Sequence, residues 1–520
     1  MEVAASSSAP GLLDRERVVA GPGFNRWLVP PAALAIHLCI GMAYGFSVFW
    51  LPLSRALGVT QPVACPDLTL ARALVTTTCD WRVADLGWMY TLFFVFLGSS
   101  AALWGGWLER AGPRKAGVVS AVCWCGGIVI AAVGVVVHQL WIMWLGGGVI
   151  GGIGLGLGYI SPVSTLVKWF PDRRGMATGM AIMGFGGGAM IGAPLANLLM
   201  TYFRTPASVG VWETFVVLAA VYFVFMMSGA FAYRVPPPDY ALAASPRQPI
   251  TVASVHYRDA PKTKQFWLIW AVLCLNVSAG IGVIGMASPM LQEIFGASAA
   301  VAAGFTGLIS LFNIGGRFFW ASLSDRIGRK ATYATFFLLG IVLYAGAPSL
   351  ARAGSQALFV LAVCVIVSMY GGGFATVPAY LADTFGAQYV GAIHGRLLTA
   401  WSTAGIIGPV LVNYIREAQI AAGVPRQQVY DFTMYILAGL LVVGFVANWL
   451  VKPLPGSVGA VSSRPLRTAD PGPRIPDPGR HAVAAFDFRT AVAWAAVGVP
   501  IAWGAWITFT QALVLFSGGA

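Results

Sequence analysis

The sequence contains little charge. Asp, Glu, Lys and Arg make up only 10% of its 520 residues, whereas soluble globular domains carry about 25%. Hydrophobic residues make up 58%, and the mean hydropathy is +0.76. These values argue against a soluble protein and indicate an all-α polytopic membrane protein. The net charge of +13 does not indicate nucleic-acid binding, because most Lys and Arg residues lie in short loops between apolar runs.

Residue patterns that carry enzymatic or metal chemistry are also missing. Cys123 and Cys125 lie in an apolar run without a neighbouring His, and no Ser/His/Asp arrangement or catalytic carboxylate pair is visible. The stretch "GGGVIG" at Gly146–Gly151 fits a dinucleotide-binding pattern. It follows no strand and lies inside an apolar run, so close helix packing explains these glycines better. We therefore expect no enzyme activity, no metal and no cofactor.

Long apolar runs are what the sequence does contain. Twelve of them are long enough to cross a bilayer, which takes about 20 residues. Six of these runs precede a polar segment that is rich in Pro and charged residues, and six follow it. A further apolar run near the C-terminus is predicted to form a thirteenth transmembrane helix, although a tail lying in the membrane interface is an alternative. The predicted organisation is a cytoplasmic tail at 1–25, a six-helix bundle at 26–233, a cytoplasmic linker at 234–265, a second six-helix bundle at 266–452, a disordered linker at 453–489 and the thirteenth helix at 490–516.

The distribution of Lys and Arg predicts the orientation in the membrane. More of them fall on the inner side if the N-terminus is cytoplasmic, as the positive-inside rule requires. We therefore expect a multi-pass protein of the plasma (inner) membrane. This orientation places Cys65 and Cys79 in an external loop, where disulfides form. We expect a bridge between them, with two free thiols as the alternative.

The two halves of the chain repeat each other. The stretch "GGWLERAGPRK" at Gly105–Lys115 is similar to "ASLSDRIGRK" at Ala321–Lys330. Common ancestry of two six-helix halves follows, with a substrate site expected between them near the middle of the membrane. An offset of 216 residues pairs Glu109 with Asp325, Arg110 with Arg326, Gly112 with Gly328, Pro162 with Pro378 and Asn197 with Asn413.

The first copy resembles the signature of the major facilitator superfamily of transporters, and the resemblance covers about residues 27–451. It implies a fold of two pseudo-symmetric six-helix bundles. Carboxylates and arginines at helix ends can form ion pairs that hold one gate state, so we interpret both copies as gating motifs. The alternative is simple positive-inside anchoring. The matching residues are Gly105, Glu109, Arg110, Gly112, Arg114 and Lys115, with Glu109 replacing the usual Asp, and Asp325, Arg326 and Gly328 in the second copy, where Ala321 replaces Gly.

Several stretches also resemble the oxalate/formate antiporter family within that superfamily. They are "YGFSVF" at Tyr44–Phe49, "KWFPDRRGMATG" at Lys168–Gly179, "GGRFFWASLSDRIGR" and "GAIHGR" at Gly391–Arg396. That family exchanges small carboxylates, and its type member uses one cation in helix eight and another in helix eleven. Arg317 and Arg396 stand at those places here, although the type member has Lys in helix eleven.

The position of Arg317 is unusual on physical grounds as well. A charge in a membrane helix costs about 2.5–3.5 kcal/mol and indicates function by default. Arg317 precedes Asp325 by eight residues, which is about 12 Å along a helix and close to the midplane. Arg396 has a similar predicted depth. The alternative is that each guanidinium bonds helix-end carbonyls or extends to an interface.

No acidic residue occupies a clear mid-span position that would balance these arginines. Asp85, Asp383 and Glu293 lie near span ends. A substrate anion would supply the missing charge, and a small dicarboxylate suits two guanidinium groups. Further candidates for substrate binding are Tyr44, Tyr159, Tyr370, Phe374 and Asn313, with Trp401 a weaker one.

The predicted function is exchange of small carboxylate anions of the oxalate/formate type by alternating access. We expect a monomer that interacts with the lipid bilayer and a small anion. Arginine remains protonated, which favours exchange over proton symport. The alternatives are a monocarboxylate or other organic-anion porter, with or without proton coupling through His37 or His394, and a transporter-like sensor.

Overall fold

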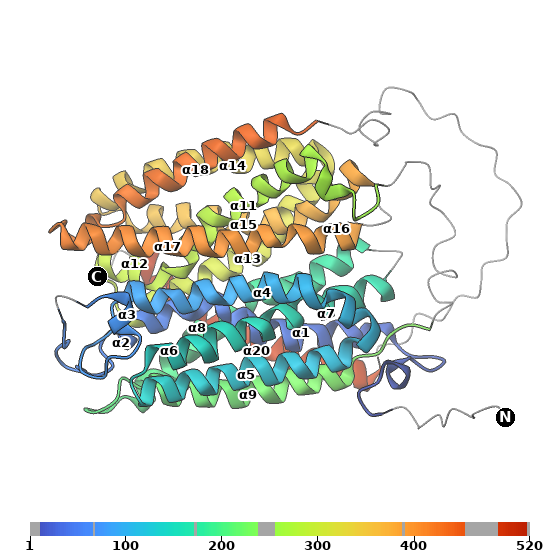
Figure 1. Ribbon diagram of the computed structural model, residues 1–520, viewed down its shortest axis with the longest axis horizontal. Helices are drawn as coiled ribbons and strands as arrows, with labels where there is room; N and C mark the ends of the chain where they lie inside the picture. The colour runs from blue at the N-terminus through green and yellow to red at the C-terminus, as the bar shows by residue number, and fades with distance from the viewer. Residues whose placement is uncertain are drawn as a thin grey trace, which may run out of the picture.

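The computed structural model describes residues 11–65, 68–170, 174–237, 255–386, 390–452 and 487–516. Within these ranges thirteen helices are long and apolar enough to cross a membrane, and no extended strand occurs apart from isolated bridges. The long helices run side by side (Figure 1). Two six-helix halves and one additional helix therefore make up the molecule, as the sequence predicts. Residues 1–10 of the predicted tail and 238–254 and 453–486 of the predicted linkers lie outside the described residues.

The first half runs from the short 3-10 helices near the N-terminus to α9. Its elements are η1 (Arg15–Val18), η2 (Arg26–Leu28), α1 (Val29–Ile40), the 3-10 segment η3 (Gly41–Phe49), α2 (Trp50–Leu53), α3 (Leu70–Ala73), α4 (Val83–Ala111), α5 (Pro113–Val136), α6 (Leu140–Met143), the π-helical η4 (Trp144–Gly151), α7 (Gly152–Trp169), α8 (Arg174–Phe203) and α9 (Val211–Ala232).

The second half and the additional helix follow. Their elements are η5 (Ala260–Lys262), α11 (Lys264–Gly285), α12 (Ala287–Phe295), α13 (Ala299–Ile327), α14 (Arg329–Arg352), α15 (Gln356–Phe385), α16 (Val390–Leu397), α17 (Thr399–Ala421), η6 (Arg426–Gln428), α18 (Asp431–Leu450) and α20 (Phe488–Phe516).

The internal repeat is visible in the helix boundaries. α13 begins and ends 216 residues after α4, and α14 does the same relative to α5. The turns that end α4 and α13 contain Gly112 and Gly328, with φ of 87° and 86°. Side chains strain this left-handed conformation, so glycine suits both turns. At the next turn His138, with φ of 49°, stands where the second half has Gly354.

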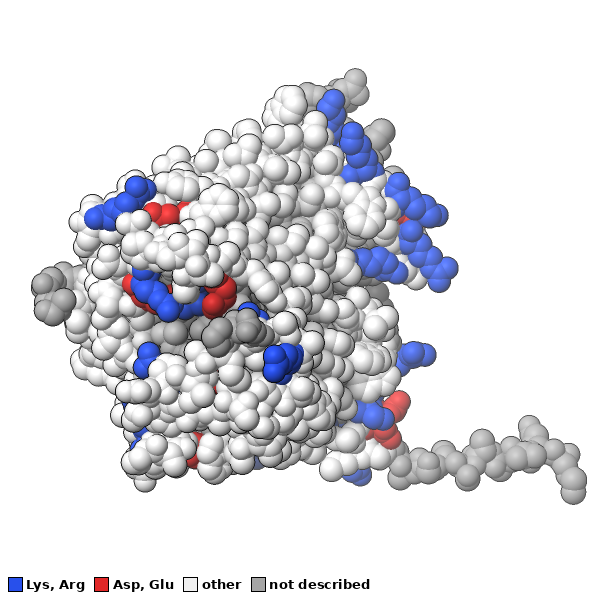
Figure 2. All heavy atoms as spheres, turned by 60° about the vertical axis from the view of Figure 1, so that its left-hand side comes forward, with Lys and Arg blue, Asp and Glu red and all other residues white. Residues whose placement is uncertain are grey.

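The two ends of the bundle differ in chemistry. We call the end with Gly112 and Gly328 the motif face, and the end with the Cys65–Cys79 disulfide the disulfide face. The motif face lies on the right of Figure 1, near α16, and the disulfide face lies on the left, near α2 and α3. Figure 2 shows Lys and Arg along the right-hand edge and mostly uncharged atoms on the flank between the ends. This distribution fits helices that cross an apolar layer.

Several spans are interrupted where the two halves meet. The first span changes from α1 to the 3-10 segment η3, the seventh breaks at Met286 between α11 and α12, and the eleventh breaks at Leu398 between α16 and α17. A mid-helix stretch of 3-10 conformation often marks a hinge. These interruptions lie in spans that carry candidate site residues, including Tyr44 and Arg396.

The thirteenth helix, α20, packs against both halves. It contacts α1 and α8 of the first half and α13 of the second, and in Figure 1 it lies beside α1 and α8. It thus packs against the bundle along one side, while most of its residues are partly or fully exposed.

Candidate functional site

Arg317 lies inside the molecule, on α13 between the two halves. Its side chain is only 2% exposed. Its Nε donates a hydrogen bond to Oδ1 of Asn313 at 3.0 Å, and its guanidinium carbon lies 5.7 Å from the ring centroid of Phe374. Its Nη1 has no hydrogen-bond partner among the described residues. Asn313 and Phe374 therefore orient the guanidinium and leave Nη1, which carries two N–H groups, available.

Among the described residues, no acidic side chain forms an ion pair with Arg317. Each of the three acids that the sequence offers near the span ends pairs with another arginine. Within the described ranges, Arg317 forms no ion pair. The observed pairs are Asp85 with Arg82 at 2.8 Å, Asp383 with Arg329 at 3.5 Å, and Glu293 with Arg416.

Aromatic side chains from both halves pack together, and one of them, Phe374, faces the guanidinium. The hydroxyls of Tyr44 and Tyr370 share a hydrogen bond of 2.7 Å that joins the halves. The rings of Tyr159 and Phe374 lie 5.2 Å and 4.5 Å from that of Trp401, centroid to centroid. We call this group the aromatic cage, and its members are Tyr44, Phe94, Tyr159, Phe185, Tyr370, Phe374 and Trp401.

Three buried polar groups of the site lack hydrogen-bond partners in the part of the chain that the structure describes. They are Nη1 of Arg317, Nε1 of Trp401 and the hydroxyl of Tyr159. All three can donate a hydrogen. The Tyr159 hydroxyl and the Arg317 guanidinium lie next to each other and interact, although they form no hydrogen bond of good geometry. An unsatisfied buried polar group costs about 1–3 kcal/mol. A small anion with acceptor oxygens would satisfy donors of this kind and balance the charge.

The cage is closed in this structure. A cavity of about 10 Å³ beside it, lined in part by Tyr44, Ser310 and Asn313, has room for about one water molecule. α4 and α17 pack tightly along their lengths: a Cβ on Gly87 would lie 2.1 Å from Nδ2 of Asn413, and one on Gly98 would lie 2.0 Å from Oγ of Ser402. On the side of the disulfide face, the halves must therefore separate before an anion can enter.

The structure does not bring Arg396 to Arg317, which corrects the expected pair. Arg396 is exposed, and its guanidinium carbon lies 4.6 Å from the ring centroid of Tyr257. Counting residues gave its depth along the helix but not its direction around the axis. The buried side of this span carries Ile393, Leu397, Ala400, Trp401 and Ala404. The described site thus contains one guanidinium, and Trp401 takes the more central position.

Most of the other predicted site residues do come together. Asn313, Tyr44, Tyr159, Tyr370 and Phe374 all lie in the cage or contact Arg317. Phe94 and Phe185 complete the cage but were not predicted. Their apolar spans offered no chemical signal, since Phe is common in membrane helices, and only the packing of α4 and α8 shows their role.

The second gating motif forms a small charge network at the motif face. Asp325 pairs with Arg329 at 2.5 Å, and Arg329 also approaches Asp383 at the end of α15 at 3.5 Å. Arg326 is exposed. These bonds lie within the second half.

The first gating motif is organised by Arg114. This side chain is 5% exposed and donates to the carbonyl oxygens of Leu12 and Phe231 at 3.0 Å and 3.1 Å. These contacts also lie within one half, so the gating role of the motifs remains a prediction. Gly105 lies within α4, Arg110 is exposed, and the side chain of Glu109 lies outside the described residues.

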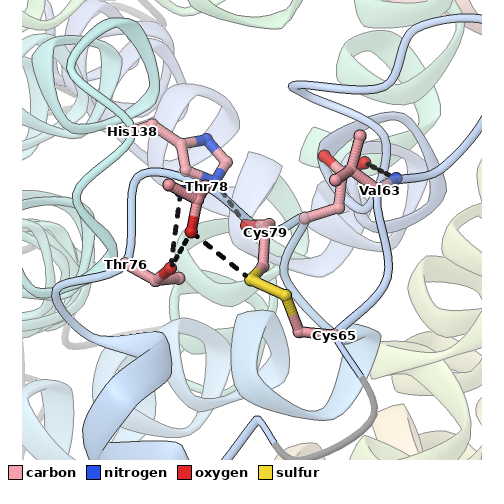
Figure 3. The surroundings of a disulfide bond; sticks show 7 residues. Val63, Cys65, Thr76, Thr78, Cys79 and His138 are labelled. Atoms are coloured by element: carbon pink, nitrogen blue, oxygen red, sulfur yellow. Dashed lines mark hydrogen bonds between the residues drawn. A yellow bond between two sulfur atoms is a disulfide. The ribbon is translucent and has the colours of Figure 1, made fainter.

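The loop at the disulfide face is tied together by several bonds. Cys65 and Cys79 form a disulfide, and Nε2 of His138 lies 2.9 Å from the carbonyl oxygen of Cys79 (Figure 3). The His138 ring stacks on Trp81 at 3.9 Å. Burial lowers the pKa of His138, so the ring is neutral and its Nε2–H donates to this carbonyl. Asp80 accepts three backbone N–H bonds from the same loop.

Comparisons with known proteins agree with this fold. The profile of the Major Facilitator Superfamily matches residues 33–409. The oxalate:formate antiporter of Oxalobacter formigenes is 26% identical over 394 residues, which cover 74% of this chain and 83% of that protein. Apicoplast pyruvate carrier 1 of Toxoplasma gondii is 24% identical over 447 residues, covering 69% and 78%. The solved xylose transporter XylE from E. coli, in a partially occluded inward-open conformation, has a TM-score of 0.58 at 14% identity, covers 82% of this chain and 99% of its own, and is similar in fold.

Proposed function

The chain belongs to the Major Facilitator Superfamily of membrane transporters, and we propose that it exchanges small carboxylate anions across the membrane by alternating access. One observation carries the proposal: a buried guanidinium, Arg317, has no counter-charge among the described residues. The unpaired donors of Trp401 and Tyr159 lie in the same cage. Relatives named for oxalate, formate and pyruvate support a carboxylate substrate.

The number of charges favours a substrate with one carboxylate group. A guanidinium binds a carboxylate through two parallel N–H···O bonds and balances one negative charge. Because Arg396 lies elsewhere, a dianion such as oxalate would leave one negative charge unbalanced among aromatic rings. A monoanion such as formate would leave the cage neutral. We therefore place monocarboxylates ahead of the dicarboxylate that a pair of arginines would suit.

The same charge explains exchange. Opening the cage to either side requires the Tyr44–Tyr370 bond between the halves to break. Reorientation with an unbalanced buried cation is unfavourable, and a bound anion removes that cost. A carrier of this kind changes sides faster when loaded, so one anion leaves as another enters.

A proton-linked monocarboxylate porter is the second candidate. The ring of His37 stacks on Tyr159 at 5.5 Å, and its Nε2 lies 3.1 Å from the Tyr159 carbonyl oxygen. A titratable group so close to the cage offers a site for a co-transported proton. Uptake driven by a pH gradient into liposomes without internal anion would support this candidate over exchange.

We further propose that the motif face is cytoplasmic and that the protein lies in the plasma (inner) membrane. The Lys and Arg residues at the edge of the molecule in Figure 2 support this orientation through the positive-inside rule. The disulfide then lies on the outer side.

The test is counterflow in liposomes. Labelled formate, and in a second series labelled oxalate, enters liposomes that contain either anion, and the rate is compared for wild type, Arg317→Gln and Arg204→Gln. Arg204 is an exposed arginine outside the cage and serves as the control. We expect Arg317→Gln to reduce exchange roughly 100-fold, which corresponds to about 3 kcal/mol, and Arg204→Gln to exchange normally. Wild-type exchange by Arg317→Gln would refute the assignment, and binding without flux would indicate a sensor.

A further inference from the structure

α8 contains a backbone carbonyl that its own helix cannot satisfy in the usual way. Pro194 lies inside this helix and has no N–H group, so the carbonyl oxygen of Met190 lacks its donor four residues further on. Thr508 of α20 supplies a donor: its Oγ1 donates to this oxygen at 3.2 Å. Met190 is 1% exposed and Thr508 is fully buried. The thirteenth helix therefore completes the hydrogen bonding of a helix in the first half.

Glycines allow α20 to come this close to both halves. A Cβ on Gly307 of α13 would lie 2.3 Å from Oγ1 of Thr508. A Cβ on Gly504 of α20 would lie 2.7 Å from the side chain of Ile191 in α8. Larger residues at either position would push α20 away. Thr508 thus lies at the seam between α8 and α13.

A residue of the second half, Ser310, forms hydrogen bonds with the preceding turn of α8. Oγ of Ser310 in α13 donates to the carbonyl oxygen of Gly186 at 2.5 Å and accepts from the backbone N–H of Met190 at 3.2 Å. The hydroxyl therefore contacts both ends of one i to i−4 pair, which is a recognised cause of helix bending. We call residues 186–194 the α8 hinge, since two successive turns of it bond to groups outside the helix.

The α8 hinge also touches the anion site. A Cβ on Gly186 would lie 3.1 Å from Nε of Arg317 and 3.1 Å from Oδ1 of Asn313. Ser310 lies one turn before Asn313 on α13, so the same face of α13 holds the hinge and the guanidinium. A shift of the hinge would move the wall of the site.

α20 is fixed to the first half at its other end. Nε1 of Trp494 donates to the carbonyl oxygen of Trp27 at 3.1 Å, and Nδ2 of Asn25 donates to Oγ1 of Thr490 at 3.0 Å. When the halves separate, these bonds and the Thr508 bond keep α20 with the first half. Its contacts with the second half, which are with α13 around Gly304 and Gly307 and with α15, then have to slide.

We propose that α20 takes part in transport and that Thr508 is a positioning residue, which holds the α8 hinge against the Arg317 site while the halves move. A helix that merely adds lipid-facing surface would not need a buried hydroxyl at the seam. The proposal rests on the proposed function only in that its kinetic test needs a transported anion.

The kinetic test compares formate counterflow of the full-length protein carrying Thr508→Val, Thr508→Ser or Thr510→Val. Thr508→Val keeps the shape and removes the donor. Thr510 is the matched control, because it is exposed on the same helix and its hydroxyl bonds Ile507 within α20. We expect Thr508→Val to lower the maximal rate about fivefold, the factor for one buried hydrogen bond of about 1 kcal/mol, with KM unchanged. Thr508→Ser should restore the rate, and Thr510→Val should match wild type.

A double-mutant cycle asks whether Thr508 acts through Met190. Pro194→Ala gives the Met190 carbonyl a donor within α8, so Thr508→Val should have no further effect in that background. The double variant also tests the proposal if Thr508→Val alone does not fold. Pro194→Ala gives the Met190 carbonyl a donor, so the double variant should then fold. An undiminished loss in the Pro194→Ala background, or a wild-type rate for Thr508→Val, would overturn the proposal.

Hydrogen–deuterium exchange separates this proposal from the proposed function. In the anion-free protein, Thr508→Val should accelerate exchange in residues 186–194, whereas Thr510→Val should not. This result does not require that any carboxylate be transported. Equal exchange in wild type and Thr508→Val would mean that α20 does not hold the hinge, whatever the substrate.

Discussion

Trp401 provides the sharpest test of the anion site. Its indole Nε1 is buried without a partner in the described residues, and its ring packs on Phe374 and Tyr159. Replacement by Phe keeps an aromatic ring and removes the N–H donor. A hydrogen bond to a charged group contributes about 1.5–3 kcal/mol. If the indole binds the carboxylate, KM should therefore rise roughly 10- to 150-fold.

The same substitution should leave the anion-free protein about as stable as wild type. Removing an unsatisfied buried donor relieves about 1–3 kcal/mol. The smaller ring loses apolar contact worth about 2 kcal/mol. The two effects have opposite signs and similar sizes, so the midpoint of thermal unfolding should change little while KM changes strongly.

The assay is formate counterflow over a range of concentrations, together with thermal unfolding without anion. Trp88→Phe is the matched control, because Nε1 of Trp88 already donates to the Tyr414 hydroxyl at 2.8 Å. That variant should lose stability and keep the wild-type KM. An unchanged KM for Trp401→Phe would show that the indole does not contact the anion and would remove one of the three donors from the site.

Two further predictions concern the disulfide face. Glu293→Gln removes the main counter-charge of Arg416, whose side chain is only 3% exposed. It should lower the free energy of unfolding by about 3–5 kcal/mol in a denaturant titration. Asp259→Asn, which removes an exposed ion pair with Lys262, should leave the free energy of unfolding nearly unchanged. Burial lowers the pKa of His138, so the unfolded state takes up a proton that the native state does not as pH falls below about 6.5. Thermal stability should therefore fall from pH 7.5 to pH 5.5, and His138→Asn, which tolerates the left-handed backbone, should show a smaller fall; an identical pH profile would contradict this reasoning.

The candidate site shows which features can be predicted from residue patterns and which cannot. Arg317 was predicted to be a site residue because a charged side chain inside an apolar run is costly and so indicates a function. In the structure this side chain is buried. Asn313 was predicted to be a site residue because it lies one helical turn before Arg317, and the two side chains form a hydrogen bond. Arg396 satisfied the same depth argument and yet lies on an exposed face beside Tyr257. Depth comes from counting at 1.5 Å per residue, but the direction of a side chain depends on which helices pack around it.

The sequence by itself determined the thirteen apolar spans, the repeat between the halves and the presence of a charged residue, Arg317, inside an apolar run. Each is a property of single residues or of their order, because hydropathy and charge act on a segment whatever its neighbours are. Only the tertiary structure decided which aromatic rings form the cage and that α20 bonds the carbonyl left free by Pro194. Those contacts join different helices, and Met190 and Thr508 are 318 positions apart in the chain. Close packing of helices, which no local pattern encodes, sets them.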